Sequence, residues 1–222
     1  MKRLSRAVGT AIVLTLATSA HANPIIFDNM AVVDFGFGSD YDFGGGQFIA
    51  DDFTLQAGAN TITDIHWTGF YGTADTPLAN DDFDIFIYAD AGGIPDVGNV
   101  VLSLTGITNA NRTDTGIDVS VGIPFDLYAY AIDITPLTLT ANTTYWLSIV
   151  NDTTADLDDW WAWGTDSQGS GIASSNNQVT WNVSTRAADF QLTGQAIPEP
   201  AGVALLTLGI AGLRRGRRRH RA

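Results

Sequence analysis

Residues Phe83–Asp90 read FDIFIYAD, and their alternation indicates the fold class of the chain. Successive side chains of an extended strand point to opposite faces, so Phe83, Ile85 and Ile87 share one face. The other face carries Asp84, Phe86 and Tyr88. Large apolar side chains on both faces suit a strand that is covered on both sides, as in two packed sheets. The pattern therefore favours a sandwich over a single solvated sheet.

Similar short runs recur along residues 23–196, which we treat as one domain, the body. They lie at residues 47–55, 62–71, 100–104, 125–134, 137–140, 145–150, 160–163, 179–183 and 190–192. Segments rich in Gly, Asp and Asn, which favour turns, separate most of them. The body also lacks lysine and glutamate, two good helix formers. We predict an all-β fold, an antiparallel β-sandwich of jelly-roll-like form.

Charge is distributed unevenly along the 222 residues. The body carries 23 aspartates against two cations, Arg112 and Arg186, which gives a formal net charge of −21. Such a surface repels nucleic acid, so we expect no nucleic-acid partner. The chain contains no cysteine, which excludes thiol catalysis and Cys-ligated metal sites.

The first 22 residues have the three parts of a secretory signal peptide. Three cations within the first six residues precede an apolar stretch at residues 7–18. Ala20 and Ala22 then flank His21 in a small-x-small cleavage site. We predict cleavage after Ala22 and export of the body.

The last 26 residues, 197–222, also form a three-part signal. Pro198, Glu199 and Pro200 precede an apolar segment at residues 201–213, and six arginines follow. As a helix the apolar segment would span about 20 Å, which is marginal for a permanent membrane anchor. The arginines would stay on the cytoplasmic side. The segment therefore either anchors the protein weakly in the membrane or keeps it there only until the segment is cleaved.

This order of motif, apolar segment and arginines closely resembles the PEP-CTERM sorting signal of exopolysaccharide-producing Gram-negative bacteria. The resemblance implies transient membrane insertion through a short C-terminal helix. It also implies cleavage near Pro198–Pro200 by an exosortase, followed by transfer of the body to the cell surface or the medium. Three stretches of the body, residues 50–55, 87–93 and 143–152, are similar to β-sandwich domains common among such proteins. The implied role is a structural or adhesive component of an exopolysaccharide or biofilm layer, with exopolysaccharide as a partner.

Trp160, Trp161 and Trp163 form the most unusual local cluster in the chain. In an extended strand Trp161 and Trp163 share one face, and Trp160 points to the other. Exposed tryptophans that lie in one plane stack on sugar rings, which would make the body a carbohydrate-binding module. Alternatively, tryptophans at this density fill the core between two sheets. The second interpretation is favoured, and the first remains open.

Catalytic chemistry has little support in the residue inventory. His66 is the one histidine of the body, and no G-x-S-x-G motif is present. With 23 aspartates, pairs of carboxylates are uninformative unless a cleft brings them together. We therefore expect no catalytic residues and no enzyme, and a secreted hydrolase is the least favoured interpretation.

Calcium is the cofactor that the composition leaves open. Asp81-Asp82, Asp90 with Asp96, and the aspartates at 156, 158 and 159 supply hard oxygen ligands in turns. None of these turns has the spacing of an EF-hand loop. We name no ligand set, and we keep structural calcium as a hypothesis. The alternative to calcium binding is that the acidic turns keep an exported protein soluble.

Overall fold

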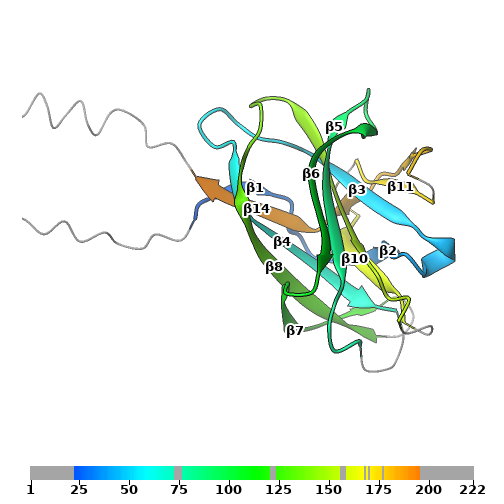
Figure 1. The fold of residues 1–222 in the computed structure, drawn as a ribbon. Coiled ribbons are helices and arrows are strands. Elements are labelled where there is room, and N and C mark those ends of the chain that lie inside the picture. Colours follow the sequence, from blue (N-terminus) through cyan, green and yellow to red (C-terminus); the bar gives the residue numbers. More distant parts are fainter. Residues whose placement is uncertain are drawn as a thin grey trace, which may run out of the picture.

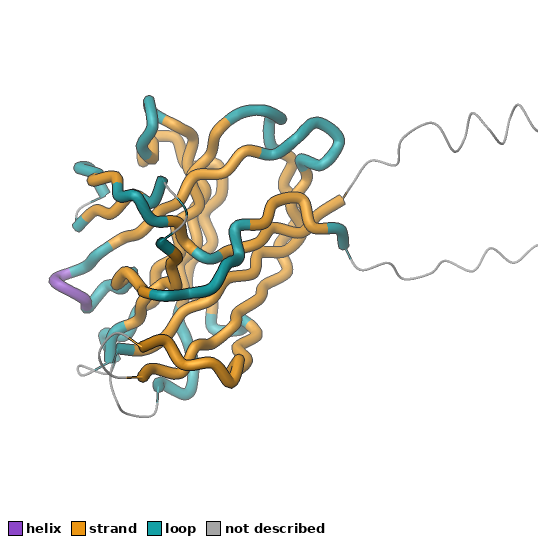
Figure 2. The backbone as a smooth tube through the Cα atoms, turned by 180° about the vertical axis from the view of Figure 1, so that it is seen from behind, coloured by secondary structure: helices purple, strands orange, loops and turns teal. Residues whose placement is uncertain are grey.

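The computed structural model describes residues 23–72, 77–120, 124–155, 159–167, 169, 171–176 and 178–195. The expected signal peptide with Ala20 and Ala22, the motif Pro198–Pro200 and the expected C-terminal helix lie outside the described residues. Within the described ranges no helix is long and apolar enough to cross a membrane. The helical structure seen there is one 3-10 turn, Phe43–Gly45, drawn in purple in Figure 2.

The strands form two sheets, which pack face to face (Figure 1). Sheet A contains β1 (Ile25–Asp28), β2 (Phe35–Gly38), β4 (Thr61–Tyr71), β7 (Asn111–Ser120), β8 (Pro124–Thr138), β10 (Trp161–Asp166), β13 (Ala187–Ala188) and β14 (Phe190–Gln195). Sheet B contains β3 (Phe48–Thr54), β5 (Phe83–Asp90), β6 (Pro95–Ile107), β9 (Thr144–Asn151), β11 (Ala173–Ser175) and β12 (Asn182–Val183). The paired strands are antiparallel, so the predicted all-β antiparallel sandwich is confirmed.

Strand order explains where the core lies. In sheet B the order is β12-β11-β3-β9-β5-β6, which places β3 and β9 in the middle and β5 beside the edge strand β6. In sheet A the long strand β4 lies between β8 on one side and β14 and β10 on the other. The inward faces of these strands supply the main core cluster, which includes Ile65, Trp67, Ile85, Leu147 and Phe190. The alternation in Phe83–Asp90 is thus the pattern of a strand with one face in this core.

The second face of sheet B is covered as well. Tyr88, Trp146 and Trp181 belong to a separate buried cluster on that side. Trp181 comes from the segment that follows β11, which folds back over the sheet. This cover accounts for the apolar residues at alternate positions on both faces of β5.

Both ends of the body leave the sandwich at the same place. β1 and β14 are antiparallel neighbours, with Ile25 opposite Thr193 (Figure 1). The Gly194 N–H donates a hydrogen bond to the Pro24 carbonyl at 3.0 Å. We call this end, at residues 23–25 and 193–195, the terminal pole. Both sheets and their clusters are built from residues 23–195, so we expect the body to fold without its flanking segments.

The opposite end of the sandwich is the distal pole, which we define by residues 71–72, 78–82 and 151–155. β4 runs from Thr61, opposite Gln195 at the terminal pole, to Tyr71. β5 begins and β9 ends beside Tyr71, because Phe83 pairs with Asn151 and the Asn151 amide contacts the Tyr71 hydroxyl. Strand direction thus separates the two poles by the length of β4.

Aspartate serves as the turn residue of this fold. Its short side chain can accept a hydrogen bond from a backbone N–H two residues further along. Pairs of this kind are Asp28 with Met30, Asp40 with Asp42, Asp90 with Gly92, Asp96 with Gly98, Asp114 with Gly116, and Asp152 with Thr154. The contact gives a physical reason for the excess of aspartate over glutamate, whose extra methylene places its carboxylate further from that N–H.

Candidate functional site

The tryptophan cluster is part of the core. Trp161 and Trp163 share one face of β10, and both side chains are 0% exposed. The Trp161 ring packs edge-on against Phe83 at 5.1 Å, and the Trp163 Nε1–H donates to the Asp189 carbonyl at 3.1 Å. An exposed stacking platform built on Trp161 and Trp163 is therefore wrong, and the core interpretation is confirmed for both.

Trp160 points to the other face of β10, as its position in the alternation predicts. It is half-buried and packs against Phe43 and Phe70 on the outer face of sheet A. Two glycines, one within β4 and one just after it, make room for the Trp161 and Trp160 rings on the two faces of the sheet. A Cβ at Gly72 would lie 1.8 Å from the Trp160 ring, and one at Gly69 would lie 2.3 Å from the Trp161 ring.

The distal pole carries a hollow of about 460 Å³, which we call the distal pocket. It is lined by Leu78, Ala79, Asn80, Asp81, Asp82, Thr108, Asp152, Thr154 and Ala155. Three separate connections thus meet in it: the approach to β5, the link between β6 and β7, and the exit from β9. Its polar groups are carboxylates, hydroxyls and one amide, and its apolar groups are small or aliphatic.

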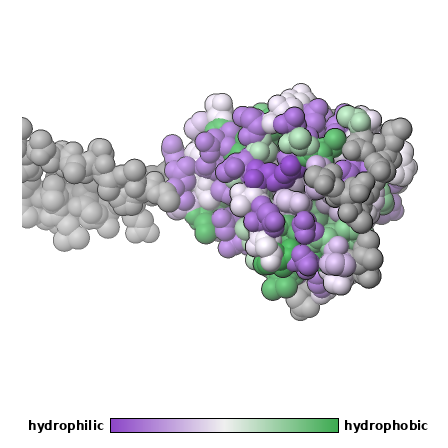
Figure 3. Space-filling view, turned by 90° about the horizontal axis from the view of Figure 1, so that it is seen from below, coloured by the Kyte–Doolittle hydropathy of each residue, from purple (hydrophilic) through white to green (hydrophobic). Residues whose placement is uncertain are grey.

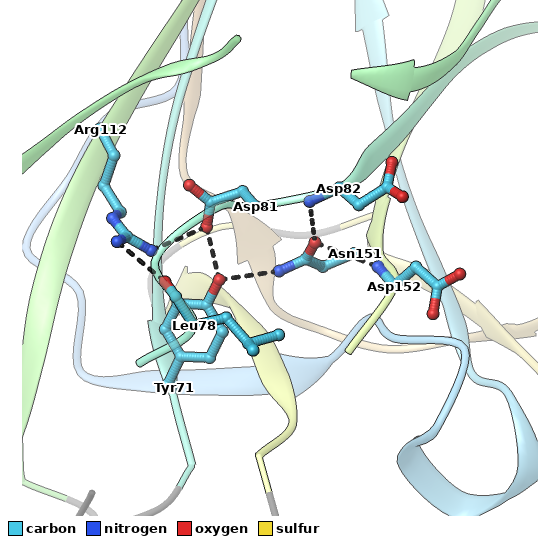
Figure 4. Close-up of polar contacts among 7 residues, drawn as sticks. All are labelled: Tyr71, Leu78, Asp81, Asp82, Arg112, Asn151 and Asp152. Atoms are coloured by element: carbon cyan, nitrogen blue, oxygen red, sulfur yellow. Dashed lines mark hydrogen bonds and ion pairs between the residues drawn. The ribbon is translucent and has the colours of Figure 1, made fainter. Parts of the chain in front are cut away.

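Asn151, at the end of β9, holds the two acidic loops of the pocket together. Its Oδ1 accepts the backbone N–H of Asp82 and that of Asp152, each at 3.0 Å (Figure 4). Its Nδ2 donates to the Tyr71 hydroxyl at 3.0 Å. The Asp152 N–H also donates to the Asp82 carbonyl at 2.8 Å. One buried amide thus fixes the relative positions of Asp82 and Asp152.

Arg112 of β7 supports the same loop from the other side. Its two terminal nitrogens donate to the Asp81 carboxylate and to the Leu78 carbonyl, both at 3.0 Å (Figure 4). The Tyr71 hydroxyl also donates to Asp81. The guanidinium lies over the Tyr128 ring at 5.4 Å. We call Tyr71, Leu78, Asp81, Arg112 and Asn151 the Arg112 network.

The electrostatics of the pocket differ between its carboxylates. Arg112 neutralises Asp81, whereas Asp82 and Asp152 point away from that cation (Figure 4). Burial, with the negative charges of Asp152 and Asp84, raises the pKa of Asp82. The Asp152 carboxylate accepts hydrogen bonds from the Thr154 N–H and hydroxyl. The pocket therefore presents acceptors in a field of negative charge, which suits a ligand rich in hydroxyl donors or a cation.

A second pair of carboxyl groups lies on the outer face of sheet A. Asp64 of β4 and Asp133 of β8 are cross-strand partners that share a hydrogen bond. Partial burial opposes ionisation of Asp64, but hydrogen bonds from Thr63 and Asn23 hold its pKa at about 2. The hydrogen bond to Asp64 raises the pKa of Asp133. Glycosidase carboxyls are separated by roughly 5 Å or more to admit sugar or water, so this pair does not fit that role.

Three of the aspartates proposed for calcium, Asp81, Asp90 and Asp96, already accept hydrogen bonds from neighbouring groups. Asp90 accepts from the N–H groups of Gly92 and Gly93 and from Trp146 Nε1. The aspartates at 156 and 158 lie outside the described residues. Within the described part of the chain, no three His, Cys, Asp or Glu side chains converge on a common point. Structural calcium stays a prediction.

Comparison with known proteins adds little to this picture. No protein-family model matches the chain, and no curated protein sequence matches it. Among solved structures, the chain is similar to the cysteine protease and lectin-like domains of Cwp84, a surface layer associated protein of Clostridium difficile. The identity is 12% and the TM-score 0.42, over 68% of this chain and 32% of that one. The chain thus spans about a third of that protein's length, and a likeness of this degree carries no functional argument.

Sequence reasoning missed the distal pocket and the Arg112 network. One signal was present: a body with 23 aspartates and two arginines places each arginine where a carboxylate can meet it. Asn151 and Tyr71 gave no signal, because their contact joins positions 80 residues apart in the sequence.

Proposed function

We propose that the protein is an exported surface or matrix component that an exosortase-type enzyme processes at Pro198–Pro200. Its body would serve a structural or adhesive role in an exopolysaccharide layer, without catalysis. The observation that carries this proposal is the order of motif, apolar segment and arginines in residues 197–222. Because β1 and β14 pair side by side, the segment that leads to the motif leaves the body at the terminal pole.

The position of the chain ends would decide which pole of the body faces outward. A body held by its C-terminal segment would have its terminal pole toward the membrane and its distal pole outward. The distal pocket would then face the matrix while the protein is still held. Most of the face shown in Figure 3 is hydrophilic, with separate hydrophobic patches, which suits a body in a hydrated layer.

The sorting step is tested by changing Pro198, Glu199 and Pro200 to alanine in the producing cells. We expect the wild-type body to appear at the surface or in the medium without its arginines, and the variant to stay full-length in the membrane fraction. A matched control replaces Thr140 and Thr143, in a loop outside the motif, by alanine and should be processed normally. Unchanged processing of the motif variant would contradict the proposal.

The distal pocket favours a second candidate function, non-catalytic binding of polysaccharide. A concave site with a few convergent polar groups is the usual form of a ligand site. Here Asp82 and Asp152 are fixed by one buried amide and offer acceptors to sugar hydroxyls. Since Trp161 and Trp163 are buried, binding would rest on hydrogen bonds in the pocket rather than on ring stacking.

Binding is measured by titrating the body with exopolysaccharide purified from the producing strain. We expect Asp82→Asn together with Asp152→Asn to weaken binding at least about tenfold, because two charge-assisted hydrogen-bond acceptors become weaker. Asp126→Asn, an exposed change on β8 of the same type, serves as control. Equal binding by all three proteins, or by none, would count against the pocket. A separate series with EDTA and with added Ca²⁺ tells whether a cation mediates binding.

A further inference from the structure

Asn23 is fixed to the terminal pole by its side chain. Its Nδ2 donates hydrogen bonds to the Asp64 carboxylate at 2.9 Å and to the Thr63 hydroxyl at 3.0 Å. The next residue is held as well, because the Pro24 carbonyl accepts the Gly194 N–H. Cleavage of the leader just before Asn23 would turn the main-chain nitrogen of this residue from an amide into a free ammonium group.

The nitrogen that cleavage would free lies close to a carboxylate. Within one asparagine residue the main-chain nitrogen and Nδ2 are at most about 4.5 Å apart. Because Nδ2 of Asn23 lies 2.9 Å from the Asp64 carboxylate, the main-chain nitrogen lies within about 7 Å of it. That distance is shorter than the screening length of about 8 Å at physiological salt. An ammonium group at this position therefore feels the charge of Asp64.

Asp64 belongs to a pair of carboxyl groups that repel each other. Asp133 of β8 is its cross-strand partner. A hydrogen bond to Asp64, together with the negative charge of Asp64, raises the pKa of Asp133. The pair thus holds a proton more tightly than separate carboxyls do, because two negative charges in contact disfavour each other. The two cations of the body, Arg112 and Arg186, pair with other aspartates.

Other titratable groups near Asn23 can be named from the strands around it. His66 lies two residues beyond Asp64 on the same face of β4, and its charge lowers the pKa of Asp133. Asp28 is at the far end of β1. The end of β14 beside β1, residues 193–195, carries no titratable side chain. Among the described residues, Asp64 and Asp133 are therefore the acidic groups that a charged N-terminus meets first.

We propose that cleavage of the leader creates an ion pair between the α-ammonium of Asn23 and the carboxyl pair of Asp64 and Asp133, a proposal that rests on the export proposed above. The pair holds the first residue of the exported body against β4. It adds a third cation to a body that has two, at a place where two carboxyls already share a proton. Before cleavage the same nitrogen is an uncharged amide, so the ion pair is a property of the mature chain alone.

The α-amino group can be followed by itself, because residues 23–195 contain no lysine and it is their one primary amine. The body is released from an N-terminal fusion by a protease that leaves Asn23 as the first residue. Its acylation by a small amine-reactive reagent is then measured against pH, since only the unprotonated amine reacts. We expect the pKa of the amine to be about 9 in the folded body and about 7.7–8.0 in urea, because a nearby anion stabilises the ammonium form.

Variants separate the local pair from the general field of an acidic body. Asp64→Asn keeps an acceptor for Asn23 but removes the charge, and it should return the pKa of the folded amine to about 8. Asp133→Asn, at the exposed member of the pair, should lower it part of the way. Asp126→Asn removes a charge from an exposed position near the start of β8 and should leave it near 9. Circular dichroism shows that each variant keeps the fold.

An amine whose pKa is the same in the folded and the urea-unfolded body would overturn the proposal. Equal effects of Asp64→Asn and Asp126→Asn would overturn it as well, because they would assign the shift to net charge. Neither result depends on processing in cells. The ion pair can fail while export proceeds as proposed, and a failure of export would leave the pKa of the amine in the purified body unchanged.

Discussion

The stability of the body should fall as the pH is raised from about 5 to about 8. The main cause is Asp51 in β3, whose side chain is 1% exposed. Burial, helped by the charges of Asp52 and Asp166, raises the pKa of Asp51 to about 8, although N–H groups of Ala188 and Asp52 donate to it. Burial also raises the pKa values of Asp40 and Asp189.

The sign follows from proton binding. Between the pKa of Asp51 in the unfolded chain, about 4, and its pKa in the folded body, the folded state holds a proton that the unfolded state has lost. Stability therefore decreases with rising pH in that window and levels off above it. For Asp51 alone the loss between pH 5 and pH 8 is on the order of 4 kcal/mol.

Urea unfolding at pH 5, 6.5 and 8 measures this dependence. Asp51→Asn removes the titrating group, and the change that it makes to the hydrogen bonds at this position does not depend on pH. The stability of this variant should therefore vary much less with pH than that of the wild type. Wild-type stability that is constant or rises between pH 5 and pH 8 would contradict the assignment of Asp51.

Replacing Arg112 by methionine should destabilise the body by about 3 kcal/mol, since removal of one partner leaves a buried charge uncompensated. The Asp81 side chain is only 7% exposed, and Arg112 is its cation. The Leu78 carbonyl would lose its donor in the same change. Arg112→Lys keeps the positive charge but lacks the planar guanidinium that reaches both acceptors. It should therefore destabilise the body less than Arg112→Met does.

The second arginine of the body provides the control. Arg186 pairs with Asp34 at a more exposed place, with side chains 26% and 43% exposed. Exposed ion pairs contribute at most about 1 kcal/mol, so Arg186→Met should have a small effect. Tryptophan fluorescence during urea unfolding compares the two variants. Equal decreases in the free energy of unfolding for the two variants would show that the Arg112 network stabilises the body no more than the exposed Arg186 pair does.

Strands with apolar residues at alternate positions could be predicted from sequence, and others could not. β5 has the predicted bounds, and β3, β4 and β9 differ from theirs by a residue or so at each end. β7 was missed because its residues are mostly exposed and polar, and pairing with β8 holds it in place. The strand expected at residues 179–183 is reduced to Asn182–Val183, because Val179 and Val183 face solvent.

The site was harder to predict than the fold. Alternation placed Trp161 and Trp163 on one face of a strand, but it could not say whether solvent or a second sheet covers that face. The distal pocket depends on contacts such as that between Asn151 and Tyr71, which exist only once both sheets are assembled. Local sequence carries no record of such contacts.

The central claim, export followed by removal of the C-terminal segment, is tested most directly by the intact mass of the protein collected from the medium or surface of its own cells. We expect a polypeptide that begins at Asn23 and ends close to Pro198–Pro200, without the arginines that follow. A released protein that still extends to Ala222 would contradict it.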